Sequence, residues 1–197
     1  NGLRGMYAIA IRDPGPNGGS GSLVLARDPF GIKPLYYVQS GSGFAFASEA
    51  QALIAAGLVA PELCPRRRGE LLQLQFTTGR ETAMRGIRRV LPGETLVIEN
   101  GRIVREIRRS AIPAGPPDEM GEDEALESLR RALIDSVSVH QRADVSYGMF
   151  LSGGVDSSTV LALMRELNEA PVRAFTVGFD DAGATDERDH ARAVAAA

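Results

Sequence analysis

Short apolar segments bounded by turn residues fill the first half of the chain. Residues 5–12 are apolar on both alternating faces, which predicts a strand that is covered on both sides. Residues 13–22 are rich in Pro, Gly, Asn and Ser, and they separate this strand from the apolar residues 23–26. Turn chemistry between two apolar segments predicts a hairpin with a long loop.

Two further hairpins are expected in this half. Residues 34–38 and 44–47 are short apolar segments joined by a Ser-Gly-Ser-Gly sequence, which supplies flexible turn residues. Asn100 and Gly101 stand between two more apolar segments, and an Asn-Gly pair is the strongest short-range hairpin signal. The first half is therefore predicted to consist mostly of antiparallel β-structure.

A short helix is predicted after the second hairpin. Ser48 and Gln51 have the spacing of a capping box, in which two side chains satisfy unpaired amides at a helix start. Gly57 is placed to end that helix in the left-handed conformation. We therefore expect one helix between these positions.

A change in composition divides the chain. Residues 111–121 are rich in Pro, Gly and acidic side chains, which is typical of a linker. We therefore expect one domain over residues 1–110 and another over residues 122–197. The second begins with three acidic residues that complement a helix dipole. Apolar residues at spacings of three and four then predict an amphipathic helix, and they are Leu126, Leu129, Leu133 and Val137.

The rest of the second domain has the order strand, glycine loop, helix, strand. Residues 145–151 and 172–177 are the predicted strands, and residues 155–168 are the predicted helix. This order over about 30 residues is typical of a βαβ unit, which implies a parallel sheet with a right-handed crossover.

The glycine loop carries the candidate chemistry. A loop that enters a helix exposes unpaired backbone N–H groups, and the helix dipole adds partial positive charge there. Gly153 and Gly154 lack side chains, so a phosphate can approach the backbone. The hydroxyls of Ser152, Ser157 and Ser158 can donate hydrogen bonds to its oxygens. The loop has no Walker A lysine.

An acidic residue in this loop, Asp156, predicts a metal ion. A carboxylate about 5 Å from a phosphate charge costs about 3 kcal/mol at an effective dielectric constant of about 20. Mg²⁺ between the carboxylate and the phosphate oxygens removes this cost, so the pattern predicts Mg-ATP rather than a bare anion. The alternative is a glycine-rich turn in which Ser152 or Asp156 only caps a helix.

The sequence Ser-Gly-Gly-Val-Asp-Ser-Ser at residues 152–158 resembles the PP-loop of ATP pyrophosphatases. GMP synthetases, NAD synthetases, tRNA thiouridylases and asparagine synthetases share this loop. Upstream, residues 27–37 and 46–49 resemble the later part of class II glutamine amidotransferase domains, and residues 3–10 resemble their central strand. Together with Leu-Pro-Gly-Glu at residues 91–94, these segments resemble the glutamine-hydrolysing asparagine synthetase family.

The resemblance implies a two-part fold. The first part would be an α+β glutaminase with Ntn-hydrolase-like antiparallel β layers, and the second an α/β PP-loop ATP pyrophosphatase domain with a parallel sheet. The chain would be a fragment, covering the later part of the glutaminase domain and the start of the synthetase domain. The family's cysteine nucleophile, arginine and Asn-Gly oxyanion element would precede this chain. Since the acidic residue and lysine of the synthetase site would follow it, no catalytic residue is assigned.

Binding residues can be carried over from the family. Its members hold adenine through backbone near the strand ends and pyrophosphate through the loop, so ATP and Mg²⁺ are the expected cofactors. The expected metal ligand is Asp156. The ATP-binding residues that the resemblance implies are Leu151, Ser152, Gly153, Gly154, Val155, Asp156, Ser157, Ser158 and Val177.

The implied activity of the parent enzyme is a carbon–nitrogen ligation. Asparagine would be made from aspartate, with glutamine as amido donor, through a β-aspartyl-adenylate that releases AMP and pyrophosphate. The parent could form a homodimer, and the fragment alone would be inactive. Two alternatives stay open: a PP-loop amidotransferase or β-lactam synthetase that acts on another carboxylate, and a non-catalytic nucleotide-binding module.

Composition narrows the class of protein. A formal net charge of −3 and a pI near 5.5 argue against a nucleic-acid binder. The single cysteine excludes an intrachain disulfide and fits a cytoplasmic location. No apolar run approaches the roughly 20 residues that a membrane span needs, so no membrane contact is expected.

Several other reactive or charged residues are expected to be structural. Cys64 has no histidine nearby in sequence, and His140 stands where a helix dipole favours a cation. His190 belongs to a charged helix start, which is typical of a solvated face. The arginines at 66–68 predict a surface patch. Arg27 and Asp28 are expected to pair with each other in a structural role.

Overall fold

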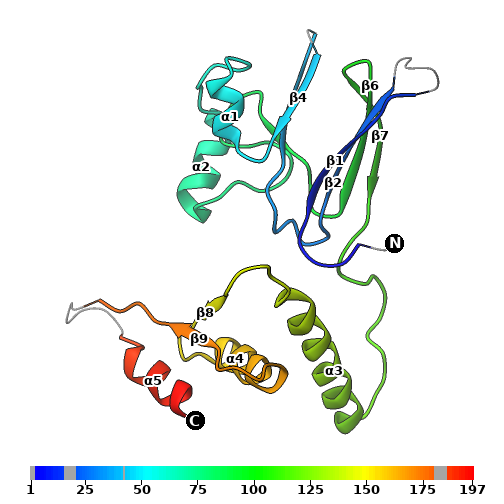
Figure 1. The fold of residues 1–197 in the computed structure, drawn as a ribbon. Coiled ribbons are helices and arrows are strands. Elements are labelled where there is room, and N and C mark those ends of the chain that lie inside the picture. Colours follow the sequence, from blue (N-terminus) through cyan, green and yellow to red (C-terminus); the bar gives the residue numbers. More distant parts are fainter. Residues whose placement is uncertain (1–2, 16–20, 42, 180–185) are drawn as a thin grey trace. The chain divides into compact units, whose positions relative to one another are not determined.

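The computed structural model describes residues 3–15, 21–41, 43–179 and 186–197. The chain consists of two compact units, Asn1–Gly115 and Pro116–Ala197 (Figure 1). The boundary lies within residues 111–121, the predicted linker, which contain no helix or strand. The assignment of residues 1–110 and 122–197 to two domains stays a prediction.

A four-stranded antiparallel sheet forms one layer of the first unit. Its order is β1-β2-β6-β7, and each strand pairs antiparallel with its neighbour. Asn100 and Gly101 have φ angles of 49° and 75°, as a two-residue Asn-Gly hairpin requires. The first and last predicted hairpins are therefore confirmed. The strands are β1 (Ala8–Asp13), β2 (Ser22–Arg27), β6 (Glu94–Glu99) and β7 (Arg102–Arg108).

A three-stranded sheet with the order β4-β3-β5 forms the other layer. The hairpin of β3 and β4 is the second one predicted, and it is confirmed. Helices α1 and α2 follow β4 in the chain (Figure 1). The elements are β3 (Tyr36–Ser40), β4 (Gly43–Ala47), β5 (Arg88–Arg89), α1 (Ala50–Ala55) and α2 (Pro65–Leu74).

The main core of the first unit lies between these sheets. Leu25 and Leu96 from the four-stranded sheet are fully buried in one cluster with Tyr37 from the three-stranded sheet. Tyr37 also stacks on Phe44, with ring centroids 5.3 Å apart. Burial of each such side chain contributes about 1.5–3 kcal/mol. The unit therefore has antiparallel β layers, as expected, whereas its Ntn-hydrolase-like identity stays a prediction.

Two local predictions in the first unit are wrong. Strand β1 is not covered on both sides: its residues from Ala10 to Asp13 are exposed, because β1 is an edge strand of its sheet. The capping box is not formed either, since the N-cap of α1 is Glu49, which makes no side-chain capping bond. Gly57 does have the predicted left-handed conformation, with a φ of 70°.

The adjacent residues Arg27 and Asp28 organise the loop that follows β2. The Arg27 guanidinium donates hydrogen bonds to the carbonyl oxygens of Gly31, Lys33 and Val90. The buried Asp28 carboxylate accepts from the backbone N–H groups of residues 30, 32 and 33 at 2.9–3.2 Å. Both side chains therefore have a structural role, and each forms its hydrogen bonds with backbone groups; their expected pairing with each other stays a prediction.

Arg80, in the loop after α2, links the two sheets through the buried Glu94 and through Tyr37. Arg80 donates to the hydroxyl of Tyr37 at 3.1 Å and to the carboxylate of Glu94 at 2.5 and 3.0 Å. Glu94 is buried, and it also accepts from the backbone N–H of Leu91. Burial alone would lower the pKa of Arg80, but its hydrogen bonds to Glu94 and Tyr37 raise that pKa above its ordinary value. The guanidinium is therefore held in its charged form.

The second unit contains the predicted βαβ unit. Strands β8 and β9 are parallel, with Gly148 opposite Arg173, and α4 connects them. Helices α3 and α4 pack through Val137, Leu163 and Met164. The small parallel sheet is therefore confirmed. The elements are α3 (Glu122–His140), β8 (Gly148–Phe150), α4 (Val155–Leu167), β9 (Arg173–Phe175) and α5 (Arg188–Ala196).

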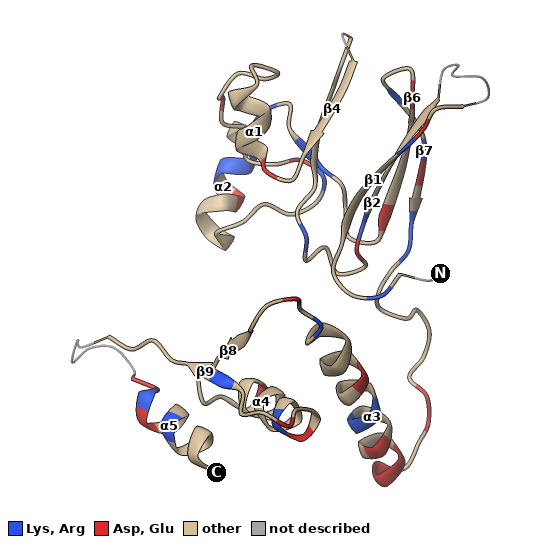
Figure 2. Cartoon of the chain, in the orientation of Figure 1, with Lys and Arg blue, Asp and Glu red and all other residues tan. Residues whose placement is uncertain are grey.

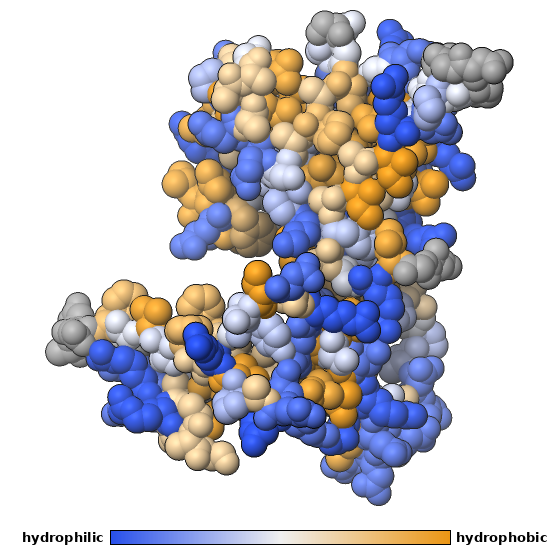
Figure 3. Space-filling view, in the orientation of Figure 1, coloured by the Kyte–Doolittle hydropathy of each residue, from blue (hydrophilic) through white to orange (hydrophobic). Residues whose placement is uncertain are grey.

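The predicted apolar stripe of α3 is only partly buried. Val137 is buried against α4, while Leu126 and Leu129 are 57% and 55% exposed. Apolar residues accordingly reach the surface over this helix (Figure 3), and its acidic first turn is visible in Figure 2. Among the described residues, the apolar stripe of α3 is packed against other side chains only along its later turns. Among the described residues, no helix is both long and apolar enough to cross a membrane.

Candidate functional site

The candidate site is the loop that leaves β8 and enters α4. Leu151 extends the pairing of the two parallel strands, because its N–H donates to the carbonyl of Phe175 at 2.8 Å. The Thr176 hydroxyl donates to the carbonyl of Leu151, also at 2.8 Å. The loop therefore starts at the carboxyl end of a parallel sheet, where open α/β sheets bind ligands.

The two glycines of this loop have different roles. Gly153 has a φ of 80°, and a Cβ atom there would lie 2.6 Å from Cδ2 of His190 and 3.0 Å from the backbone nitrogen of Ala191. Both the conformation and the contact therefore require glycine. Gly154 is the N-cap of α4, with a φ of −67°, and a Cβ atom there would meet only the Ser152 hydroxyl at 3.4 Å. Its backbone is consequently open to an approaching group.

Two of the three predicted serines lie together. The hydroxyl oxygens of Ser152 and Ser157 are 3.1 Å apart. The Gly154 N–H donates to the Ser152 hydroxyl at 3.3 Å, and the Ser157 hydroxyl donates to the Gly154 carbonyl at 3.1 Å. Hydroxyl groups can exchange such partners by rotation, so both can turn toward a phosphate oxygen.

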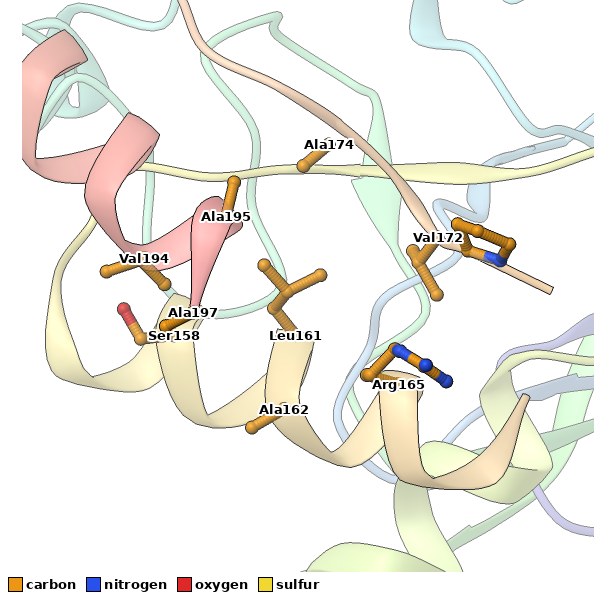
Figure 4. Close-up of a pocket in the computed structure, with 10 residues that line it drawn as sticks. Ser158, Leu161, Ala162, Arg165, Val172, Ala174, Val194, Ala195 and Ala197 are labelled. Carbon is orange, nitrogen blue, oxygen red and sulfur yellow. The ribbon is translucent and has the colours of Figure 1, made fainter. Parts of the chain in front are cut away.

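The third serine, Ser158, has a different environment. Its hydroxyl oxygen is buried and has no hydrogen-bond partner among the described residues. It lines a groove of about 670 Å³ between α4, β9 and α5, together with Leu161 and Val194 (Figure 4). Its predicted contact with phosphate stays a prediction.

The start of α4 is electrostatically suited to an anion. The Ser158 N–H donates to the Gly154 carbonyl, which leaves the N–H groups of residues 155–157 as the unpaired amides of the first turn. The helix dipole adds partial positive charge at the same place. Asp156 is exposed in this turn, and no group of three or more His, Cys, Asp or Glu side chains lies together among the described residues. A cation here would therefore need ligands from a bound phosphate.

A second feature, a cavity of about 300 Å³, lies at the same ends of the strands. Leu151 and Thr176 line it from the strands, and Arg188 and Arg192 line it from α5. Leu151 is buried, whereas Val177, the other residue predicted to hold adenine, is 73% exposed. The two predicted adenine positions thus flank the strand ends at different depths.

The remaining candidates are Cys64 and the two histidines. Cys64 is the N-cap of α2, and its N–H donates to the carbonyl of Ala83. Nδ1 of His140 lies 2.7 Å from the carbonyl oxygen of Ser136 on its own helix. His190, in contrast, lies against Gly153. No periodicity in the sequence links residues 153 and 190, so only the folded structure reveals this contact.

Two protein-family models match the chain. Residues 1–108, more than half of the chain, match the family described as glutamine amidotransferase domain. The chain belongs to this family. Residues 128–197 match the family described as asparagine synthase, so the predicted resemblance to glutamine-hydrolysing asparagine synthetases is confirmed.

Curated relatives cover both parts of the chain. Asparagine synthetase [glutamine-hydrolyzing] 1 of Bacillus subtilis is 36% identical over 196 residues, which are 99% of this chain and 30% of that protein. The putative asparagine synthetase of Mycobacterium tuberculosis is 38% identical over 92% of this chain and 28% of that protein. Amidase chyE of Penicillium rubens is 31% identical over 98% of this chain and 30% of that protein. The chain thus spans about 30% of the length of these relatives.

Proposed function

We propose that this chain belongs to an enzyme that makes asparagine from aspartate, using ATP and glutamine as amido donor. The observation that supports this most is the Gly153-Gly154 loop at the carboxyl end of β8, which leads directly into α4. The same chain matches both a glutamine amidotransferase and an asparagine synthase family. A PP-loop fold for the second unit and an Ntn-hydrolase-like fold for the first are part of this proposal.

The proposed nucleotide site uses residues 151–158 and 177. Backbone groups of Leu151 and Val177 would hold the adenine. The loop residues Ser152 to Ser158 would hold the phosphates, through the unpaired N–H groups of α4 and the serine hydroxyls. The two glycines allow the backbone to approach the phosphate closely.

Mg²⁺ fits this donor set. Asp156 has an exposed carboxylate at the mouth of an otherwise positive helix end, and carboxylate plus phosphate oxygens are the usual ligands of Mg²⁺ in nucleotide sites. When bound, the ion would neutralise charge on the leaving pyrophosphate. Asp156 would hold the ion, while the amides of residues 155–157 hold the phosphate oxygens.

The reaction needs activation because ammonia cannot displace an oxide ion from a carboxylate. The aspartate side-chain carboxylate would attack the α-phosphorus of ATP, forming β-aspartyl-adenylate and releasing pyrophosphate. Ammonia from glutamine would then attack the acyl carbon and release AMP. This chain's loop would stabilise the negative charge that develops on the leaving pyrophosphate. No residue of the chain is assigned a catalytic role, and the isolated chain is expected to be inactive in both half-reactions.

The proposal also covers the substrate class, the location and the assembly of the enzyme. Its substrates are small molecules, its location is cytoplasmic, and a homodimer is the proposed assembly. The net charge of −3 fits the proposed absence of nucleic-acid binding.

The test is exchange of labelled pyrophosphate into ATP, measured in the complete protein that carries this chain. Exchange that depends on aspartate supports the proposed adenylation. Exchange that depends on another carboxylic acid would move the proposal to a related amidotransferase or β-lactam synthetase. Nucleotide binding without exchange for any acid would favour a non-catalytic binding module.

A further inference from the structure

The first turn of α5 closes one side of the glycine loop. Cδ2 of His190 and the backbone nitrogen of Ala191 would lie 2.6 and 3.0 Å from a Cβ atom on Gly153. Ala191 is buried, which fixes this turn against the rest of the unit, while His190 is exposed. The imidazole therefore stands beside the loop, at its solvent side.

The ring of His190 is available to a ligand. Cδ2 is bonded to Nε2, so the ring edge beside Gly153 carries a nitrogen atom. Neither ring nitrogen has a hydrogen-bond partner among the described residues, whereas Nδ1 of His140 is 2.7 Å from a backbone carbonyl. A neutral imidazole always carries one N–H donor, and a charged imidazole carries two.

The neighbouring charges of α5 are already paired. Arg188 lies 2.7 Å from Asp186, and Arg192 lies 2.5 Å from Asp189. The loop itself has one acidic side chain, Asp156, and no basic side chain. The imidazole of His190 lies against Gly153, so it can add a nitrogen donor to the serine hydroxyls of the loop.

We propose that His190 binds a phosphate group on the Gly153-Gly154 loop, donating a hydrogen bond from its imidazole. This inference rests on the proposed binding of ATP at the loop and adds a residue from a separate helix to that site. The ligand class is a nucleoside triphosphate or inorganic pyrophosphate. His190 would also link α5 to the loop, since the same ring packs on Gly153.

The experiment compares His190→Phe, His190→Gln and His190→Ala in the complete protein. Dissociation constants are measured for Mg-ATP and for Mg-pyrophosphate, and thermal melting is recorded for each variant. Phe keeps a flat ring against Gly153 but has no donor, so both dissociation constants should rise about tenfold, with little change in melting temperature. Gln restores a donor and should recover part of the loss. His140→Phe is the matched control and should bind as the unmodified protein does.

Three results would overturn the inference. Unchanged binding in His190→Phe together with weaker binding in His190→Ala would show that the ring only packs. Unchanged binding in all three variants would show no role. Absence of Mg-ATP and Mg-pyrophosphate binding in the unmodified protein would overturn both this inference and the proposed function. Binding of Mg-pyrophosphate without aspartate-dependent exchange would instead contradict the proposed adenylation of aspartate, and the His190 series would still be decisive.

Discussion

Two loops of this chain each contain an aspartate, and the structure uses them in opposite ways. Asp28 is fully buried, and its two oxygens accept hydrogen bonds from N–H groups of its own loop. Asp156 is exposed at the start of α4, beside amides that have no partner within the helix. A carboxylate that is satisfied internally stabilises a loop, whereas an exposed carboxylate beside unpaired donors remains available for ligands.

The largest expected effect is on the stability of the first unit. Asp28→Ala removes the buried carboxylate that accepts from three backbone N–H groups, so the free energy of unfolding should fall by about 3–5 kcal/mol. Urea denaturation measures this loss, and the exposed Asp118→Asn serves as the control. A loss as small as that of the control would mean that water replaces the carboxylate and that the loop is not held by Asp28.

Asp156→Asn, in contrast to Asp28→Ala, should weaken ligand binding and leave stability nearly unchanged. Loss of the charge removes the proposed cation ligand, so Mg-ATP affinity should fall on the order of a hundredfold, which corresponds to about 3 kcal/mol. Stability should hardly change, because the side chain is exposed. Calorimetric titration with Mg-ATP measures the affinity, and Asp144→Asn, another exposed acid of the same unit, is the matched control. Equal affinity in Asp156→Asn and the unmodified protein would contradict a cation bridge.

Features that depend on neighbouring residues could be predicted from the sequence, whereas features that depend on the fold could not. The hairpins were predictable because turn residues such as Asn100-Gly101 specify a local conformation. The glycine loop was predictable because its serines and glycines are contiguous. The exposure of β1 was missed because it depends on the position of that strand in the sheet. Helix α2 was not predicted, although Pro65 at its first turn is a start signal, because its apolar pattern is weak.

The other features that the sequence did not predict are contacts between residues that lie far apart in the chain. The approach of His190 to Gly153 joins helix α5 to the glycine loop, and the spacing of these two residues along the chain follows no pattern. The Arg80–Glu94 pair likewise joins a loop to a strand of the four-stranded sheet, and charge alone does not reveal that Glu94 is buried. Both contacts depend on packing of whole elements, which periodicity does not specify.

A smaller loss of Mg-ATP affinity is expected when Gly153 is replaced, and a still smaller one when Gly154 is replaced. Gly153→Ala forces a side chain into a left-handed conformation and against His190, so Mg-ATP affinity should fall about tenfold or more. Gly154→Ala is the matched control, since its φ of −67° suits any residue and its Cβ would make an ordinary 3.4 Å contact. Equal losses in both variants would show that bare backbone, rather than the Gly153 conformation, is what the ligand requires.

The smallest expected effect is the pH dependence of the Asp28 loop. Burial alone would raise the pKa of Asp28, but the backbone hydrogen bonds, led by that of Lys33, lower it below its ordinary value. A carboxyl whose pKa is lower in the folded state stabilises the fold above its unfolded pKa of about 3.9, and this stabilisation disappears as pH falls through the folded pKa. The difference in unfolding free energy between the unmodified protein and Asp28→Asn should therefore shrink below about pH 4. Urea denaturation at pH values between about 2 and 6 measures this difference. If the difference stays constant across this range, Asp28 does not titrate with the pKa shift that its hydrogen bonds imply, and the contrast with Asp156 would rest on exposure alone.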